Sequence, residues 1–117
     1  MEFNEKIINE IAKTIQNGLL RIGITTNVKV DKHNDTLSVT TSDFQTQPVL
    51  FKRVYIDGVG KIVSRNPDAE SIFNCSLYLD YRWESFLGGR NGTELGQVDL
   101  IINTCFESVD MINIKLR

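Results

Sequence analysis

The sequence predicts an α+β protein in which an N-terminal amphipathic helix packs on a curved, mainly antiparallel β-sheet of about five to seven strands. Two observations favour this class. An apolar stripe with helical spacing runs through the first 22 residues, and alternation between apolar and polar residues dominates the second half of the chain. With 117 residues, 41% hydrophobic and 24% charged, residues 1–117 are expected to form a single domain.

The helix is predicted over roughly residues 2–21. Its apolar residues recur mostly at every third or fourth position, so they share one face. Gly23 is suited to end the helix, and Arg21 near that end complements the helix dipole. We expect the apolar face to enter the core, because a membrane-surface helix would carry more Lys and Arg on its polar side. The stripe comprises Phe3, Ile7, Ile8, Ile11, Ile15, Leu19 and Ile22.

A half-buried hairpin is expected after the helix. Val28 and Val30 alternate with polar residues, Leu37 and Val39 do the same, and residues 32–35 between them have turn chemistry.

The middle of the chain is predicted to alternate between short strands and breaks. The polar residues 41–47 are expected to connect the hairpin to a strand over residues 49–56, which is apolar on both faces. Asp57 and Gly58 are expected to form a turn before a short strand at residues 61–64.

Long strands are predicted towards the C-terminus. Apolar residues occupy every second position over residues 72–84, which indicates a sheet with one buried face. Further strands are expected near residues 98–106 and 110–117. A glycine-rich turn joins the first two of these three strands. If this turn is centred between Gly89 and Arg90, apolar residues face apolar partners across the two strands. That register sets Leu77 opposite Ile102, Leu79 opposite Leu100 and Phe73 opposite Phe106.

The two cysteines are expected to be reduced. In this register Cys75 lies on the apolar parity and Cys105 on the other, so the two side chains point apart and cannot form a relaxed disulfide. The N-terminal residues, with acids among the first six, do not fit a signal peptide. We therefore expect a cytoplasmic protein.

The charge and motif content argues against several classes of function. A net charge of −2 without a basic run disfavours nucleic acid as a partner, and no apolar run is long enough to indicate a membrane protein. The single histidine, His33, falls in a predicted turn beside no candidate nucleophile. No cofactor motif is present, so no cofactor is expected.

A pair of carboxylates is one candidate site. The predicted register sets Asp80 opposite Asp99, and two facing carboxylates can bind a metal or share a proton. The alternative is that both are solvated and Arg82 neutralises them. We favour this alternative and expect no metal, because neither a histidine nor further carboxylates adjoin the pair.

The polar parity of these strands also carries Tyr78, Ile101 and Ile72. A face that mixes aromatic, aliphatic and charged groups suits a contact surface better than bare solvent. It is expected to be covered by another part of the chain, with residues 49–56 as the first candidate, or by another subunit.

The hairpin tip at residues 88–92 is a further candidate site. Arg90 and Asn91 lie among glycines, with Trp83 and Phe86 nearby, and such groups can hold an anionic or nucleotide-like ligand. The spacing is not that of a P-loop. The alternative is a hairpin turn whose glycines supply positive φ angles.

These observations favour a non-enzymatic binding module that forms a homo-oligomer, a dimer or larger, and holds a protein partner or a small anionic ligand. The binding residues are expected among those of the tip and the mixed face. One alternative is a structural, assembly or accessory component, for example of a phage. Another is a small enzyme or metal binder that uses Asp80 and Asp99. The expected binding residues are Arg90, Asn91, Trp83, Phe86, Arg82 and Tyr78.

Overall fold

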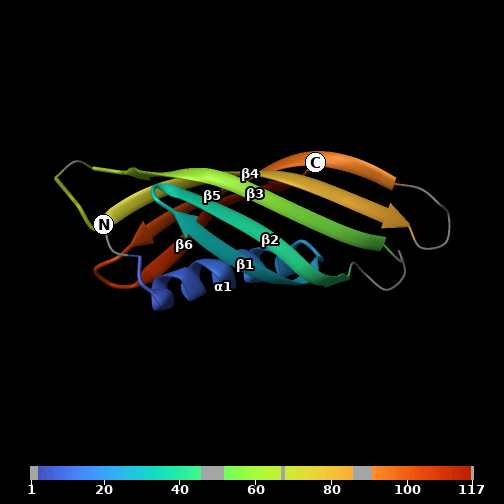
Figure 1. The fold of residues 1–117 in the computed structure, drawn as a ribbon, viewed down its shortest axis with the longest axis horizontal. Coiled ribbons are helices and arrows are strands. Elements are labelled where there is room, and N and C mark those ends of the chain that lie inside the picture. The colour runs from blue at the N-terminus through green and yellow to red at the C-terminus, as the bar shows by residue number, and fades with distance from the viewer. Residues whose placement is uncertain (1–2, 46–51, 67, 86–90, 117) are drawn as a thin grey trace.

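A computed structural model of the chain shows one helix packed on a curled six-stranded sheet, which confirms the predicted fold class (Figure 1). It describes residues 3–45, 52–66, 68–85 and 91–116, with the backbone alone at 42–45, 52–54, 83–85 and 91. The elements are α1 (Glu5–Arg21), β1 (Thr25–His33), β2 (Thr36–Gln45), β3 (Lys52–Ser64), β4 (Ile72–Ser85), β5 (Asn91–Asn103) and β6 (Ser108–Leu116).

The sheet is an antiparallel meander. Each strand pairs with the next, so the order in space is β1-β2-β3-β4-β5-β6 and the first and last strands form its two edges. The sheet curls into a half-barrel, and α1 lies along its open side in contact with both β1 and β6 (Figure 1). The helix therefore joins the two strands that are farthest apart in the sheet. No helix in the described part of the chain is long and apolar enough to cross a membrane.

The ends of α1 are set by short-range polar contacts. The Asn4 side chain accepts a hydrogen bond from the backbone N–H of Ile7 at 2.9 Å, so the helix begins at Glu5 and not near residue 2. At the other end Gly23 adopts a φ of 89°, as its predicted capping role requires, and the N–H of Ile24 returns to the carbonyl of Leu19.

The hydrophobic core lies between α1 and the concave side of the sheet. The predicted apolar stripe supplies the helical half of this core, with Ile7, Ile11, Ile15 and Leu19 almost completely buried. The strands contribute their inward-facing residues. These are Val30, Leu37, Val39, Ile56, Ile62, Phe73, Cys75, Leu77, Leu79, Val98, Leu100 and Ile102.

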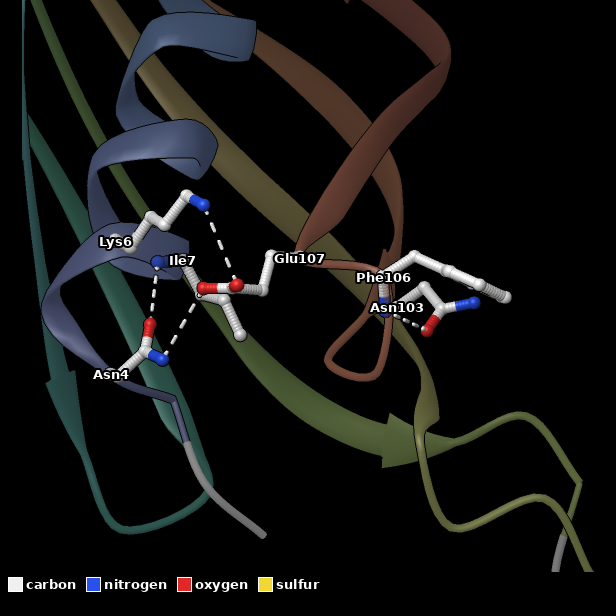
Figure 2. Close-up of polar contacts among 6 residues, drawn as sticks. All are labelled: Asn4, Lys6, Ile7, Asn103, Phe106 and Glu107. Atoms are coloured by element: carbon white, nitrogen blue, oxygen red, sulfur yellow. Dashed lines mark hydrogen bonds and ion pairs between the residues drawn. The ribbon is translucent and has the colours of Figure 1, made fainter.

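The helix N-terminus is held against the turn between β5 and β6 (Figure 2). Asn4 and Lys6 both contact the carboxylate of Glu107 at 3.5 Å. Glu107 has a φ of 51°, and the Asn103 side chain accepts hydrogen bonds from the N–H groups of Cys105 and Phe106. The contacts of Asn4 and Lys6 with Glu107 join residues that are about a hundred positions apart in the sequence.

The predicted hairpin is confirmed, but its second strand is longer than expected. β1 and β2 pair around a turn at Asn34 and Asp35, where Asn34 adopts a φ of 54°. β2 then continues to Gln45, through part of the segment predicted to be a connector. Residues 40–45, all polar except Phe44, are compatible with a strand because one face of the sheet is solvated.

The predicted turn at Asp57 and Gly58 is wrong, because β3 runs through it without a break. Gly58 and Gly60 both face the concave side. A Cβ atom on Gly60 would collide with the backbone carbonyl oxygen of Ser76, so this glycine permits close approach of β3 and β4. β3 lies within the sheet between β2 and β4, and residues 52–56 therefore do not cover the outer face as expected.

The predicted register of β4 and β5 is shifted by four positions. Leu77 pairs with Val98 instead of Ile102, and Phe73 pairs with Ile102 instead of Phe106. An even shift keeps the side chains that remain paired in β4 and β5 on their predicted faces. Phe106 is exposed in the turn after β5, and the ring of Phe73 instead meets Phe3, edge to face, with centroids 5.6 Å apart.

The last strand contains a β-bulge. Asp99 pairs with Asn113 and Leu100 with Met111, so Ile112 has no partner on β5. The predicted parity of Ile112, Ile114 and Leu116 is therefore wrong for Ile112, which is exposed, whereas Ile114 and Leu116 pack against the core.

The two cysteines are free, as predicted. Cys75 is buried in β4 and Cys105 is exposed in the β5–β6 turn. Burial, and to a smaller extent the negative charge of Asp99, raises the pKa of the Cys75 thiol to about 11. The thiolate of Cys75 is therefore scarce at neutral pH, and the side chain acts as a small apolar residue.

Truncating the centre of the helical stripe should destabilise the fold. We expect Ile11→Ala to lower the free energy of unfolding by about 2–5 kcal/mol, because it leaves a cavity between α1 and the sheet. Lys13→Ala removes an exposed side chain from the same helix and should have little effect. Urea unfolding followed by circular dichroism gives both values, and equal losses would contradict the packing of α1.

The two thiols should differ in reactivity. In native protein at about pH 8 a thiol reagent should modify Cys105 quickly and Cys75 only after unfolding. Cys105→Ser should remove the fast reaction and Cys75→Ser the slow one, as followed by absorbance of the released chromophore. Equal rates for both thiols would contradict the burial of Cys75.

Candidate interaction surface on the outer face of the sheet

The outer face of the sheet is the side turned away from α1. Along β4, residues 73, 75, 77 and 79 are buried against the core, so the residues between them project outwards. The predicted second face, with Tyr78, Asp80 and Arg82 among others, is therefore confirmed as the exposed side of β4.

Three large exposed side chains adjoin one another on this face, and we name them the outer patch: Val59, Tyr78 and Leu95. Their relative exposures are 55%, 64% and 67%. Val59 of β3 lies directly opposite Tyr78 of β4, and Tyr78 lies opposite Gln97 of β5. Leu95 is two positions before Gln97 and is therefore the diagonal neighbour of Tyr78. An apolar cluster across three neighbouring strands is thus open to solvent.

An open hollow of about 320 Å³ adjoins the outer patch. It is lined by Leu95, Gly96, Gln97 and Lys115. Gly96 forms part of the lining, and a Cβ atom there would meet the carbonyl oxygen of Lys115 and the side chain of Leu116. The hollow thus offers an aliphatic group, an amide and a cation beside Tyr78.

A polar network holds the neighbouring side chains in place. Asp99 accepts hydrogen bonds from the hydroxyl of Ser76 at 2.6 Å, from the amide of Gln97 at 2.8 Å and from the amide of Asn113 at 3.2 Å. The hydrogen bonds from Ser76 and Gln97, with a smaller one from Asn113, lower the pKa of Asp99 because they stabilise its charged form. The network links β4, β5 and β6, and fixes Gln97 at the border of the hollow.

Asp80 and Asp99 do not face each other. Asp80 lies opposite Leu95 on one side and Asp57 on the other, whereas Asp99 lies opposite Ser76 and Asn113. The prediction of a facing pair is wrong because it depended on the shifted register. Within the described ranges, no group of three or more His, Cys, Asp or Glu residues could hold a metal ion.

Arg82 neutralises a carboxylate other than the one expected. Its guanidinium lies 3.0 Å from a carboxylate oxygen of Asp57 and 5.8 Å from the ring centre of Tyr55. Because Asp57 is directly opposite Asp80, this ion pair reduces the repulsion between two facing carboxylates. Arg82 therefore has a local structural role at the edge of the outer patch.

The predicted hairpin tip is only partly described. Phe86 and Arg90 lie outside the described residues. Trp83 and Asn91 belong to β4 and β5, with backbone partners Gly92 and Glu84, and their side chains lie outside the described part of the chain. Ligand binding at the tip therefore stays a prediction.

Sequence reasoning found Tyr78 but missed Val59 and Leu95. Val59 follows a segment mistaken for a turn, and Leu95 lies between the predicted glycine-rich turn region, residues 87–94, and the strand expected near residues 98–106. A signal for Val59 was present, since Val59, Lys61 and Val63 alternate with residues that face the core. Continuing the strand parity through Gly58 would have placed Val59 outside.

Comparison with known proteins adds no functional assignment: no family model, curated protein or solved structure matches this chain.

The Asp99 network should make stability depend on pH. The pKa of Asp99 is lower in the folded than in the unfolded protein, so its contribution is complete above about pH 4 and is lost as the pH falls through the folded-state value. Asp99→Asn should therefore be less stable than the wild type at about pH 7, with a smaller difference at about pH 3. Urea unfolding at both pH values measures this, and a constant difference would contradict the network.

Proposed function

We propose that this chain is a non-enzymatic, cytoplasmic protein-binding module whose partner docks on the outer face of the sheet, with Tyr78 at the centre of the contact. The observation that carries the proposal is the outer patch, in which Val59, Tyr78 and Leu95 adjoin while exposed. Exposed apolar side chains that cluster gain free energy when a partner removes them from water. The two free cysteines fit a reducing compartment.

The surroundings of the outer patch favour a protein over a small molecule. Protein interfaces combine an apolar or aromatic centre with a polar rim, and tyrosine is enriched among the residues that dominate their affinity. Here Asp57, Asp80 and Arg82 border the patch on one side, and Gln97 and Lys115 border it on the other. The adjacent hollow is open to solvent, which suits a protruding side chain of a partner better than an enclosed small ligand.

The facing pair of carboxylates that supported the enzymatic alternative does not occur in the structure. Asp80 and Asp99 have different cross-strand partners. Asp99 accepts three hydrogen bonds that lower its pKa, so it is held in its charged form and is a poor proton donor at neutral pH. Binding without catalysis is therefore the reading that this face supports best.

Removing the tyrosine ring should weaken partner binding strongly without unfolding the protein. Because Tyr78 is mostly exposed, Tyr78→Ala should leave the Tm nearly unchanged. It should nevertheless make the free energy of binding to a purified partner less favourable by about 2 kcal/mol or more. Lys29→Ala, an exposed substitution on β1, is the matched control.

The partner is sought by immobilising the wild type and both variants and exposing them to extract of the source cells. A protein retained by the wild type and by Lys29→Ala, but not by Tyr78→Ala, is then purified and titrated by calorimetry. Equal retention of every captured protein by all three baits would rule out the outer patch as the binding surface.

A further inference from the structure

The two edges of the sheet are protected to different degrees. At the β1 edge the backbone N–H of Val28 donates to the side chain of Gln16 on α1 at 3.1 Å. At the other edge β6 pairs with β5 on one side, and among the described residues no strand lies on its other side (Figure 1). An unpaired strand edge carries N–H and C=O groups that can pair with another chain.

The free edge of β6 runs beside the helix. The two elements are in contact, with Met111 packed close to Gly18, and an open hollow of about 320 Å³ next to this contact is lined by residues that include Gly18, Arg21 and Ile112. Ile112, at the bulge, is a large aliphatic side chain with 61% of its surface exposed. The edge thus combines a backbone with which no described strand pairs and an exposed apolar residue.

The residues of β6 are complementary to those of a second β6 strand that runs in the opposite direction. If two copies pair antiparallel about the middle of residues 109–116, Asp110 of each copy lies opposite Lys115 of the other. Val109 and Met111 meet the apolar Leu116 and Ile114, and the two bulge residues, Ile112 and Asn113, face each other at the centre. The pairs are Val109 with Leu116, Asp110 with Lys115, Met111 with Ile114, and Ile112 with Asn113.

The bulge makes this pairing possible on the correct faces. In a regular strand Met111 and Ile114, three positions apart, would point to opposite sides. Here both pack against the core, whereas Asp110 and Lys115 are both exposed. A two-fold axis perpendicular to the sheet keeps inner residues inside and outer residues outside, so each facing pair lies on one side of the joined sheet.

We propose that this protein forms a symmetric homodimer in which the β6 strands of two copies pair antiparallel and join the two sheets into one. Asp110 and Lys115 form two equivalent charge pairs on the outer side, and Ile112 lies next to the symmetry axis, where the second copy covers it. The axis places both outer patches on the same side of the dimer. This inference does not depend on the proposed function, because Val59, Tyr78 and Leu95 take no part in the pairing; Lys115 borders the hollow beside the outer patch, but Asp110 does not.

Charge exchange tests the register directly. In a dimer of the Asp110→Lys variant, each of the two charge pairs would consist of two facing lysines. In a dimer of the Lys115→Asp variant, each pair would consist of two facing aspartates. Each single variant should therefore weaken the dimer about tenfold or more at low salt. The double variant, and an equimolar mixture of the two single variants, restore both attractive pairs and should dimerise like the wild type.

Sedimentation velocity over a concentration series up to about 500 μM measures the monomer–dimer equilibrium of each variant. This range includes the weak affinities that are typical of small interfaces. Asp80→Lys, the same substitution on β4, is the control and should leave the dimer unchanged. Circular dichroism confirms that each variant is folded.

A wild type that stays monomeric throughout would overturn the proposal. So would a dimer that tolerates both single substitutions, responds equally to Asp80→Lys, or is not restored in the mixture, because each result would assign self-association to another surface.

Discussion

The burial of one helical stripe against the concave side of the sheet is the interaction on which the rest of the structure depends. A meander places its first and last strands at opposite edges, and in this chain α1 contacts both of them. Ile7, Ile11, Ile15 and Leu19 thereby close the half-barrel and remove its inner face from water. Since an isolated antiparallel sheet of this kind has an apolar face to cover, helix burial and sheet curvature depend on each other.

Closure of the inner face decides which residues are left for contacts with other molecules. Side chains alternate along each strand, so every strand that supplies a core residue also presents its neighbours on the outer face. Val59, Tyr78 and Leu95 contribute little to the core, and their exposure carries a cost in solubility. Their exposure is the observation on which the proposed partner contact depends.

The sequence was sufficient for the helix and for the faces of β4 and β5, but not for the register of these strands or for the face of Ile112 in β6. Periodicity distinguishes inside from outside, and an even shift leaves this distinction unchanged, so Leu77 was placed correctly although its partner was not. The outer patch depends on which residues of three strands adjoin, and that information is absent from any one strand. Gly58 was misread because glycine permits both a turn and the close approach of two strands.

The bulge in β6 links the polar network to the free edge of the sheet. Asn113, the second bulge residue, donates to Asp99, and the register shifts immediately after Asp99 on the facing strand. The same carboxylate is held by Ser76 of β4, so its position is fixed from two strands. A bulge leaves one residue without a cross-strand partner, and here the hydrogen bond from Asn113 to Asp99 favours Ile112 as that residue. The Asp99 network thus helps to determine both the polar border of the outer patch and the side chain that β6 exposes at its edge.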